Sequence, residues 1–195
     1  MTSHFIELMA RRASASDSAR SAGSAPVPAG NLNSGSIEAA ELSGAVQVDC
    51  TFCEIVGGIQ GAYTVYEDDD VLAFLDILPI RPGHLLLVPK KHYERVTYLP
   101  SEVSASIGRV MPKIARAMCR AVEQPDFNIV SNQGYGQVVP HVHYHLIPAP
   151  SHHVSASAPS KGRKIYGRHE LEDEEGEEIA RKIREELKKE GSPKL

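Results

Sequence analysis

Three histidines at alternating positions are the residues of this 195-residue sequence with the clearest chemical potential: His141, His143 and His145. On an extended strand, side chains two residues apart share a face and lie roughly 6.6 to 6.8 Å apart along the chain. We therefore predict a strand over residues 141–147 with the three imidazoles on one side. Packing alone does not explain this pattern, because each ring has two nitrogens that need hydrogen-bond partners.

Two chemistries suit such a strand. Alternating histidines can bind one divalent metal ion with an open coordination position, which activates a water molecule. Alternatively, one neutral imidazole attacks phosphorus as a nucleophile while its neighbours orient it and stabilise charge. Residues 132–137 (NQGYGQ) favour the second chemistry, because a glycine-containing turn with side-chain amides offers neutral hydrogen-bond donors to phosphate oxygens.

The surrounding sequence predicts an α+β fold that positions these histidines. β-rich runs at 63–66 and 71–75 flank an acidic turn, and the apolar run 84–88 follows Pro82-Gly83, which predicts three strands. Apolar residues every three or four positions predict a central helix over about 101–122 and a second helix near the C-terminus. Two further strands are predicted at 127–131 and 141–147.

The composition divides the chain into three parts. Residues 1–48 are rich in Ala, Ser and Gly and are predicted to be a disordered leader. Residues 49–150 form the predicted folded domain, and residues 151–195 a C-terminal tail with a charged helix. Seven of the nine residues 170–178 are acidic, which is typical either of a solvated helix face or of an interaction surface.

Charge and cysteine content exclude several classes of protein. With 21 Lys and Arg against 25 Asp and Glu, the net charge of −4 argues against a partner that is a nucleic acid polymer or a membrane surface. No apolar run approaches the roughly 20 residues of a membrane-spanning helix. Three cysteines make no disulfide framework, and Cys50 and Cys53 form a C-x-x-C that indicates metal or thiol chemistry. We expect a cytoplasmic or nuclear protein, with a mitochondrial location left open by the arginines of the leader.

Several motifs in the same order resemble the histidine-triad (HIT) family of nucleotide hydrolases and transferases, whose hallmark is His-φ-His-φ-His-φ-φ with φ apolar. The resemblance covers about residues 50–150 and includes the C-x-x-C, the run AFLDI at 73–77, PKKH at 89–92 and the Gly-Gln before the triad. It is closest to the phosphoramidase-like branch with a C-x-x-C zinc site. It implies a HIT-like antiparallel sheet with a packed central helix, usually in a homodimer.

The resemblance also implies roles for individual residues. His143 matches the nucleophile that attacks the α-phosphorus and carries a transient nucleotidyl group, His145 matches the neighbour that contacts the phosphate, and His141 completes the catalytic triad. Asp76 matches the carboxylate that binds the ribose hydroxyls. The other nucleotide-binding positions are Phe52, Ile55 and Phe74 around the base, and Asn132 and Gln137 at the α-phosphate.

The resemblance further implies a structural zinc ion held by Cys50, Cys53, His92 and His141, with free thiols as the alternative, and no catalytic metal. If zinc binds the ring of His141, that ring cannot orient the nucleophile through the same nitrogen. His84, in a mostly apolar run, is expected to be structural.

These observations predict a purine-nucleotide enzyme that hydrolyses adenosine 5′-phosphoramidates or related AMP conjugates through a covalent histidine–AMP intermediate. Three alternatives stay open: a diadenosine polyphosphate hydrolase, a hydrolase that uses the triad to bind a catalytic metal, and a zinc-stabilised nucleotide-sensing interaction module. The family often has a hydroxyl residue after the Gly-Gln pair, whereas this chain has Val138. This departure bears on the leaving group.

Overall fold

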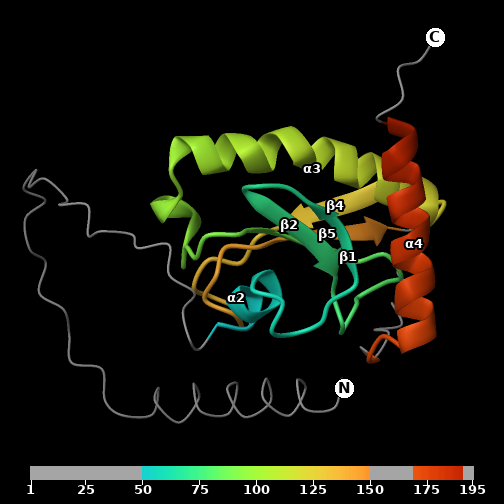
Figure 1. The fold of residues 1–195 in the computed structure, drawn as a ribbon, viewed down its shortest axis with the longest axis horizontal. Helices are drawn as coiled ribbons and strands as arrows, with labels where there is room; N and C mark the ends of the chain where they lie inside the picture. Colours follow the sequence, from blue (N-terminus) through green and yellow to red (C-terminus); the bar gives the residue numbers. More distant parts are fainter. Residues whose placement is uncertain (1–49, 150–168, 191–195) are drawn as a thin grey trace, which may run out of the picture. The chain divides into compact units, whose positions relative to one another are not determined.

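A five-stranded antiparallel sheet forms the centre of the protein in a computed structural model that describes residues 50–149 and 169–190 (Figure 1). The predicted leader at 1–48 lies outside the described residues. The strand order is β1-β2-β3-β5-β4, so β3 joins the N-terminal hairpin to the two later strands. This confirms the predicted α+β class. The strands are β1 (Thr64–Glu67), β2 (Val71–Leu75), β3 (Leu85–Pro89), β4 (Asp126–Val130) and β5 (Tyr144–Ala149).

The acidic turn between β1 and β2 is closed by a carboxylate, as the sequence pattern suggests. Oδ1 of Asp68 accepts the backbone N–H groups of Asp70 and Val71, both at 2.9 Å. An Asp side chain that accepts backbone N–H groups in this way stabilises a turn. Every residue of β2 and β3 is buried, in agreement with the apolar character of both runs.

Two long helices pack on the sheet and with each other. The helix α3 (Ser101–Ala121) buries Ile107, Ile114 and Met118 in the main core, as its three- and four-residue spacing predicts. The helix α4 (Asp173–Glu190) packs against α3 and β1 (Figure 1). Within the described ranges, no helix is both long enough and apolar enough to cross a membrane.

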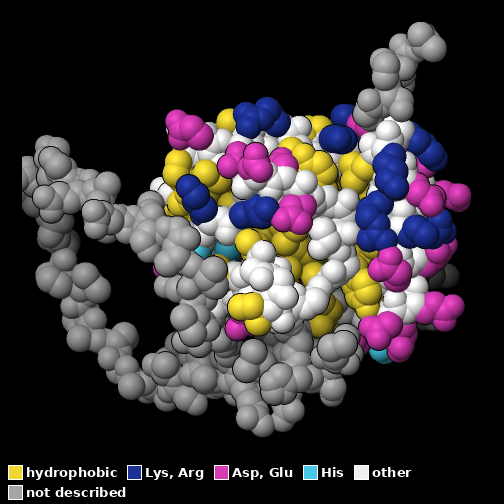
Figure 2. Space-filling view, viewed as in Figure 1, with side chains coloured by type: hydrophobic (Ala, Val, Ile, Leu, Met, Phe, Trp, Pro, Cys, Tyr) yellow, Lys and Arg dark blue, Asp and Glu magenta, His cyan; other side chains and the backbone are white. Residues whose placement is uncertain are grey.

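The C-terminal helix is part of the same core as the sheet. Ile179, Ile183 and Leu187 lie four residues apart on its buried face and belong to the main hydrophobic cluster. Acidic side chains occupy its first turn and basic side chains its last, an order that suits the helix dipole (Figure 2). At its end, hydrogen bonds from Arg116 and Arg120 lower the pKa of Glu190 to about 2.

The strand that carries the triad begins later than predicted. The expected strand over 141–147 starts only at Tyr144, because the preceding segment bonds to a loop instead of to the sheet. The backbone N–H of Val142 donates to the carbonyl of Tyr93 at 2.6 Å. Val142 and Leu146, two of the residues that alternate with the histidines, are fully buried.

Gly83 sets the start of β3 and therefore the position of His84. Its φ is +83°, a conformation that side-chain-bearing residues rarely adopt. A Cβ at this position would lie 2.6 Å from Cγ1 of Val122 at the end of α3. Both constraints require glycine here, where the chain passes close to the end of α3 just before it enters β3.

Candidate active site and metal centre

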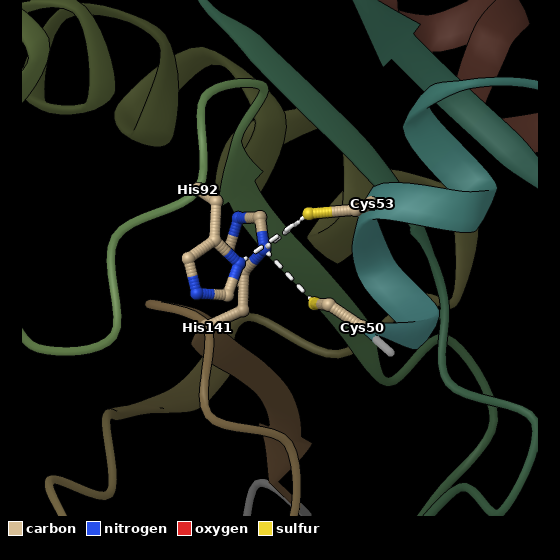
Figure 3. A group of neighbouring side chains, drawn as sticks. All are labelled: Cys50, Cys53, His92 and His141. Carbon is tan, nitrogen blue, oxygen red and sulfur yellow. Dashed lines mark hydrogen bonds between the residues drawn. The ribbon is translucent and has the colours of Figure 1, made fainter. Parts of the chain in front are cut away.

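Four side chains from three separate segments converge at one end of the sheet (Figure 3). Cys50 precedes the short helix α2 (Thr51–Val56) and Cys53 lies in its first turn, His92 lies in the loop after β3, and His141 lies just before β5. Nδ1 of His141 is 3.4 Å from Sγ of Cys50 and 3.6 Å from Sγ of Cys53. Nδ1 of His92 is 3.4 Å from Sγ of Cys53. The structure thus brings all four predicted zinc ligands together.

The distances in this group fit a tetrahedral zinc ion. Zn–S bonds of about 2.3 Å and Zn–N bonds of about 2.0 to 2.1 Å would place sulfur and nitrogen roughly 3.5 to 3.6 Å apart. The four ligand atoms all lie within 4.8 Å of one another. Nε2 of His141 faces the carbonyl oxygen of Pro89 at 2.8 Å, and because a carbonyl only accepts, the proton is on Nε2 and Nδ1 offers its lone pair to the group.

Burial adds an electrostatic argument for a cation. Desolvation raises the pKa of the Cys50 thiol to about 11 and lowers the pKa of His141 to about 4. Burial also lowers the pKa of His92. The histidines are therefore neutral, as metal ligands must be, and a bound cation would compensate the cost of ionising the thiols. These residues could hold zinc in a closed four-ligand site.

The middle histidine of the triad is buried and held in one tautomer. Nδ1 of His143 lies 2.6 Å from the main-chain carbonyl oxygen of His141, so Nδ1 carries the proton and donates it. Burial lowers the pKa of His143, which keeps the ring neutral at pH 7. A neutral ring with its proton on Nδ1 has a lone pair on Nε2. His143 is therefore chemically equipped to act as a nucleophile.

The third histidine of the triad contacts His84. Nε2 of His84 lies 2.9 Å from Nδ1 of His145. On its other side, Nδ1 of His84 faces the backbone N–H of Ile80 at 3.2 Å and a carboxylate oxygen of Asp76 at 3.4 Å. Because an amide only donates and its contact is the shorter one, we place the proton of His84 on Nε2. His84 then donates to His145, which must carry its own proton on Nε2.

His84 was expected to be structural and was not predicted to be part of the site. Its contact with His145 depends on the antiparallel pairing of β3 with β5, in which Leu86 lies opposite His145. The sequence did contain one signal: His84 is a polar residue in an otherwise apolar run. Such a residue is expected to be buried and then needs a hydrogen-bond partner. That signal indicates that a partner exists without showing which residue it is.

Of the residues predicted to surround the base, Phe52 contacts both His143 and Phe74. The ring of Phe52 is 5.2 Å from that of His143 and 5.7 Å from that of Phe74, both in edge-on arrangements. Phe52 and Phe74 are buried, and Ile55 on α2 is buried as well. Asp76 follows β2, and its Oδ1 accepts the backbone N–H of Leu78 at 2.9 Å, which orients the carboxylate.

The turn at 132–137 is tied to the loop after β3. Oε1 of Gln137 accepts the backbone N–H of Gly134, and its Nε2 donates to the carbonyl of Glu94, both at 2.8 Å. The side chain of Asn132 lies next to Gly136: a Cβ built on Gly136 would lie 3.7 Å from Cγ of Asn132. Both predicted phosphate-binding amides are thus in the turn, and the amide of Gln137 is already engaged with the protein.

The three triad histidines do not converge on one point, which disfavours a catalytic metal held by all three. The ring of His141 faces the cysteines, and that of His145 faces His84. Among the described residues, the groups that could hold a metal are the cysteine–histidine group and a second set of Asp76, His84 and His145. In that second set, the direct hydrogen bond between the two imidazoles already occupies a nitrogen of each ring.

Comparison with known proteins agrees with this architecture. The HIT domain matches residues 60–152. An uncharacterized HIT-like protein of Methanocaldococcus jannaschii is 45% identical over 101 residues, which are 51% of this chain and 78% of that protein. An adenylylsulfatase of Arabidopsis thaliana is 37% identical over 121 residues, which are 61% of this chain and 59% of the plant protein.

Solved structures share the fold. A hypothetical histidine triad nucleotide-binding protein from Sulfolobus tokodaii has a TM-score of 0.63 at 32% identity, over 72% of this chain and 93% of that one. A Zn-bound histidine triad family protein from Mycobacterium smegmatis has a TM-score of 0.59 at 33% identity, over 72% and 94% of the two chains. With its triad, its five-stranded sheet and these relatives, the chain belongs to the HIT-domain family.

Proposed function

We propose that the protein is a nucleotidyl hydrolase that cleaves adenosine 5′-phosphoramidates or related AMP conjugates through a covalent histidine–AMP intermediate. The observation that carries this proposal is the 2.6 Å hydrogen bond from Nδ1 of His143 to the carbonyl oxygen of His141. It leaves a lone pair on Nε2 of a ring that burial keeps neutral. The similarity to an adenylylsulfatase, whose name denotes an AMP–sulfate conjugate as substrate, supports an AMP conjugate here.

The proposed reaction has two displacements. In the first, Nε2 of His143 forms a bond to the α-phosphorus, and the bond from phosphorus to the leaving group breaks with its electron pair going to that group. In the second, water attacks phosphorus and gives up a proton to solvent, the N–P bond breaks with its electron pair returning to Nε2 of His143, and AMP leaves. His145 carries its proton on Nε2 and can donate that proton to a phosphate oxygen or to the leaving group.

The proposed nucleotide pocket uses the residues around His143. Phe52, Ile55 and Phe74 would pack against the base, which favours apolar and aromatic contact. The carboxylate of Asp76 would accept hydrogen bonds from the ribose hydroxyls. Asn132 and Gln137 would contact the α-phosphate, with the amide of Gln137 exchanging part of its bonding to Glu94 for the ligand.

The proposed zinc ion is structural. Cys50, Cys53, His92 and His141 supply four ligands, which leaves no open coordination position for substrate or water. When bound, the ion would cross-link α2 to the loop after β3 and to the segment before β5. The nucleophile does not need it as a Lewis acid, because the lone pair of His143 is already available.

The edge strand β4 supports the proposal of a homodimer. All five of its residues are exposed, and the apolar side chains of Phe127, Ile129 and Val130 are 36%, 49% and 40% exposed. An exposed apolar edge strand presents unpaired backbone groups that can pair with a second chain. A second copy of this protein, adding its own β4, would cover this edge.

A substrate panel with trapping of the intermediate tests the enzymatic proposal. The panel contains an AMP–lysine phosphoramidate, adenylylsulfate and diadenosine polyphosphates, and rapid acid quenching with mass spectrometry detects nucleotide on the protein. We expect AMP release and an adduct on His143. His143→Ala should abolish both, whereas His169→Ala, a histidine outside the site, should change neither.

The same panel separates the alternatives. A clear preference for dinucleotides would identify a diadenosine polyphosphate hydrolase. Turnover that is lost on chelation and restored by metal, without any adduct, would indicate a catalytic metal and contradict the covalent mechanism. AMP binding without turnover of any conjugate would favour the nucleotide-sensing module.

A further inference from the structure

The candidate metal centre and the proposed nucleophile are joined through a single residue, His141. Its ring points Nδ1 at the sulfurs of Cys50 and Cys53, at 3.4 and 3.6 Å. Its main-chain carbonyl accepts the proton of Nδ1 of His143 at 2.6 Å. The far side of the ring is held by the carbonyl of Pro89. A ligand that fixes the ring of His141 therefore also restrains the carbonyl that orients the nucleophile.

A second connection runs through the C-x-x-C segment itself. Phe52 lies between the two cysteines, and its ring contacts His141 and His143 at centroid distances of 5.9 and 5.2 Å. Phe52 is also part of the proposed base pocket. Any shift of the cysteines moves Phe52 with them, and so alters the wall beside the nucleophile.

The helix α2, which carries Phe52 and Cys53, has few interactions of its own that stabilise it. The helix α2 has only six residues, and its N-cap residue, Cys50, makes no side-chain capping hydrogen bond. A helix this short is not stable in isolation, so its position depends on its packing and on any cross-link. The four converging side chains are such a cross-link when a metal ion joins them, because their segments are far apart in the sequence.

We propose that the group of Cys50, Cys53, His92 and His141 is a positioning device for catalysis as well as a structural site. Binding of Zn²⁺ there orients His143 through the carbonyl of His141 and sets the base pocket through Phe52. Metal and nucleotide consequently bind with positive coupling. This inference rests on the proposed function only in that the nucleotide binds beside His143.

Thermodynamic reciprocity gives the test. If Zn²⁺ strengthens AMP binding by some factor, AMP must strengthen Zn²⁺ binding by the same factor. We would measure AMP affinity by calorimetry on chelated and Zn²⁺-loaded protein, and Zn²⁺ affinity by competition with a chromophoric chelator, with and without AMP. Couplings between two binding sites are typically about 5- to 150-fold, so we expect a factor of about 10 in both directions. A factor of one would overturn the proposal.

A spectroscopic measurement separates positioning from a purely structural role. In ¹⁵N-histidine spectra, chelation should change the ring-nitrogen signals of His143, while those of His169, a histidine outside the site, stay as in the loaded protein. Backbone amide spectra would show whether the sheet remains folded. Global unfolding on chelation, or an unchanged His143 signal, would make the site a folding element alone and would contradict the proposal.

Matched variants complete the experiment. His92→Ala removes the least buried ligand and should weaken Zn²⁺ binding and reduce the coupling factor, whereas Cys119→Ser, a thiol change on α3, should leave both unchanged. The outcomes also separate this inference from the proposed function. Coupling without any adduct would support the coupling of metal and nucleotide binding and refute the covalent mechanism. An adduct without coupling would support the covalent mechanism and refute the coupling. Failure of loaded wild-type protein to bind AMP would refute both.

Discussion

Nε2 of His84 lies 2.9 Å from Nδ1 of His145, and the backbone N–H of Ile80 faces the opposite nitrogen of His84 at 3.2 Å. A main-chain amide thereby determines the tautomer of one histidine, which determines that of the next. His84 is 1% exposed and does not reach the surface itself. Its influence on the proposed reaction passes through the side chains that it contacts, His145 and Asp76.

Replacing His84 should therefore impair turnover by way of His145. His84→Leu removes the donor to His145, and because a net hydrogen bond contributes about 0.5 to 1.5 kcal/mol, we expect a roughly 2- to 13-fold fall in kcat. His84→Gln can still donate through its amide and should retain most of the activity. Steady-state kinetics on an AMP conjugate measures both. Equal loss in the two variants, with intact folding, would exclude the proposed tautomer chain.

The pH profile should report the burial of His143. As the proposed nucleophile, His143 must be neutral, and burial holds its pKa below the ordinary 6.5. As pH falls, kcat/KM should stay level past 6.5 and decrease only in more acidic solution. Phe52→Ser would admit water beside the ring and should move the acidic limb to higher pH. An acidic limb at or above pH 6.5 in the wild-type protein would show that His143 is not the group titrating.

The C-terminal helix should contribute substantially to stability. Ile183 is fully buried within the main core, and Ile183→Ala should lower the free energy of unfolding by about 2 to 4 kcal/mol, as is typical of a truncated core residue. Glu190→Gln, which removes only the ion pairs to Arg116 and Arg120, should have a much smaller effect. Urea unfolding measures both. Similar small effects for the two variants would mean that α4 is dispensable to the core.

The edge strand β4 should mediate self-association. Ile129→Lys places a charge in the middle of the exposed apolar strand and should shift a dimer to monomer in light scattering coupled to gel filtration. Val138→Lys introduces the same charge at an exposed residue outside the strand and should leave the dimer intact. A monomeric wild-type protein, or a dimer that survives Ile129→Lys, would exclude this edge as the interface.

Much of the fold was predictable because its signals are local. The acidic turn between β1 and β2, the buried run of β3 and the apolar stripes of α3 and α4 follow from short-range periodicity and turn chemistry. The predicted start of β5 was wrong by three residues, since the strand begins at Tyr144 and not at His141. The alternation of His141 and His143 predicts a strand, whereas in the structure the backbone N–H of Val142 donates to the carbonyl of Tyr93 in a loop.

The sequence by itself determined which chemistry this protein can carry: three alternating histidines, a C-x-x-C and an amide-rich turn before the triad. Residue type and spacing along one segment are sufficient for that. Only the tertiary structure decided which nitrogen of each imidazole faces which partner. It places the ring of His141 against the cysteines and the main-chain carbonyl of His141 against Nδ1 of His143, and it brings His84 into contact with His145. Those relationships join residues up to 91 positions apart, and they depend on strand register and side-chain orientation, which local sequence patterns do not encode.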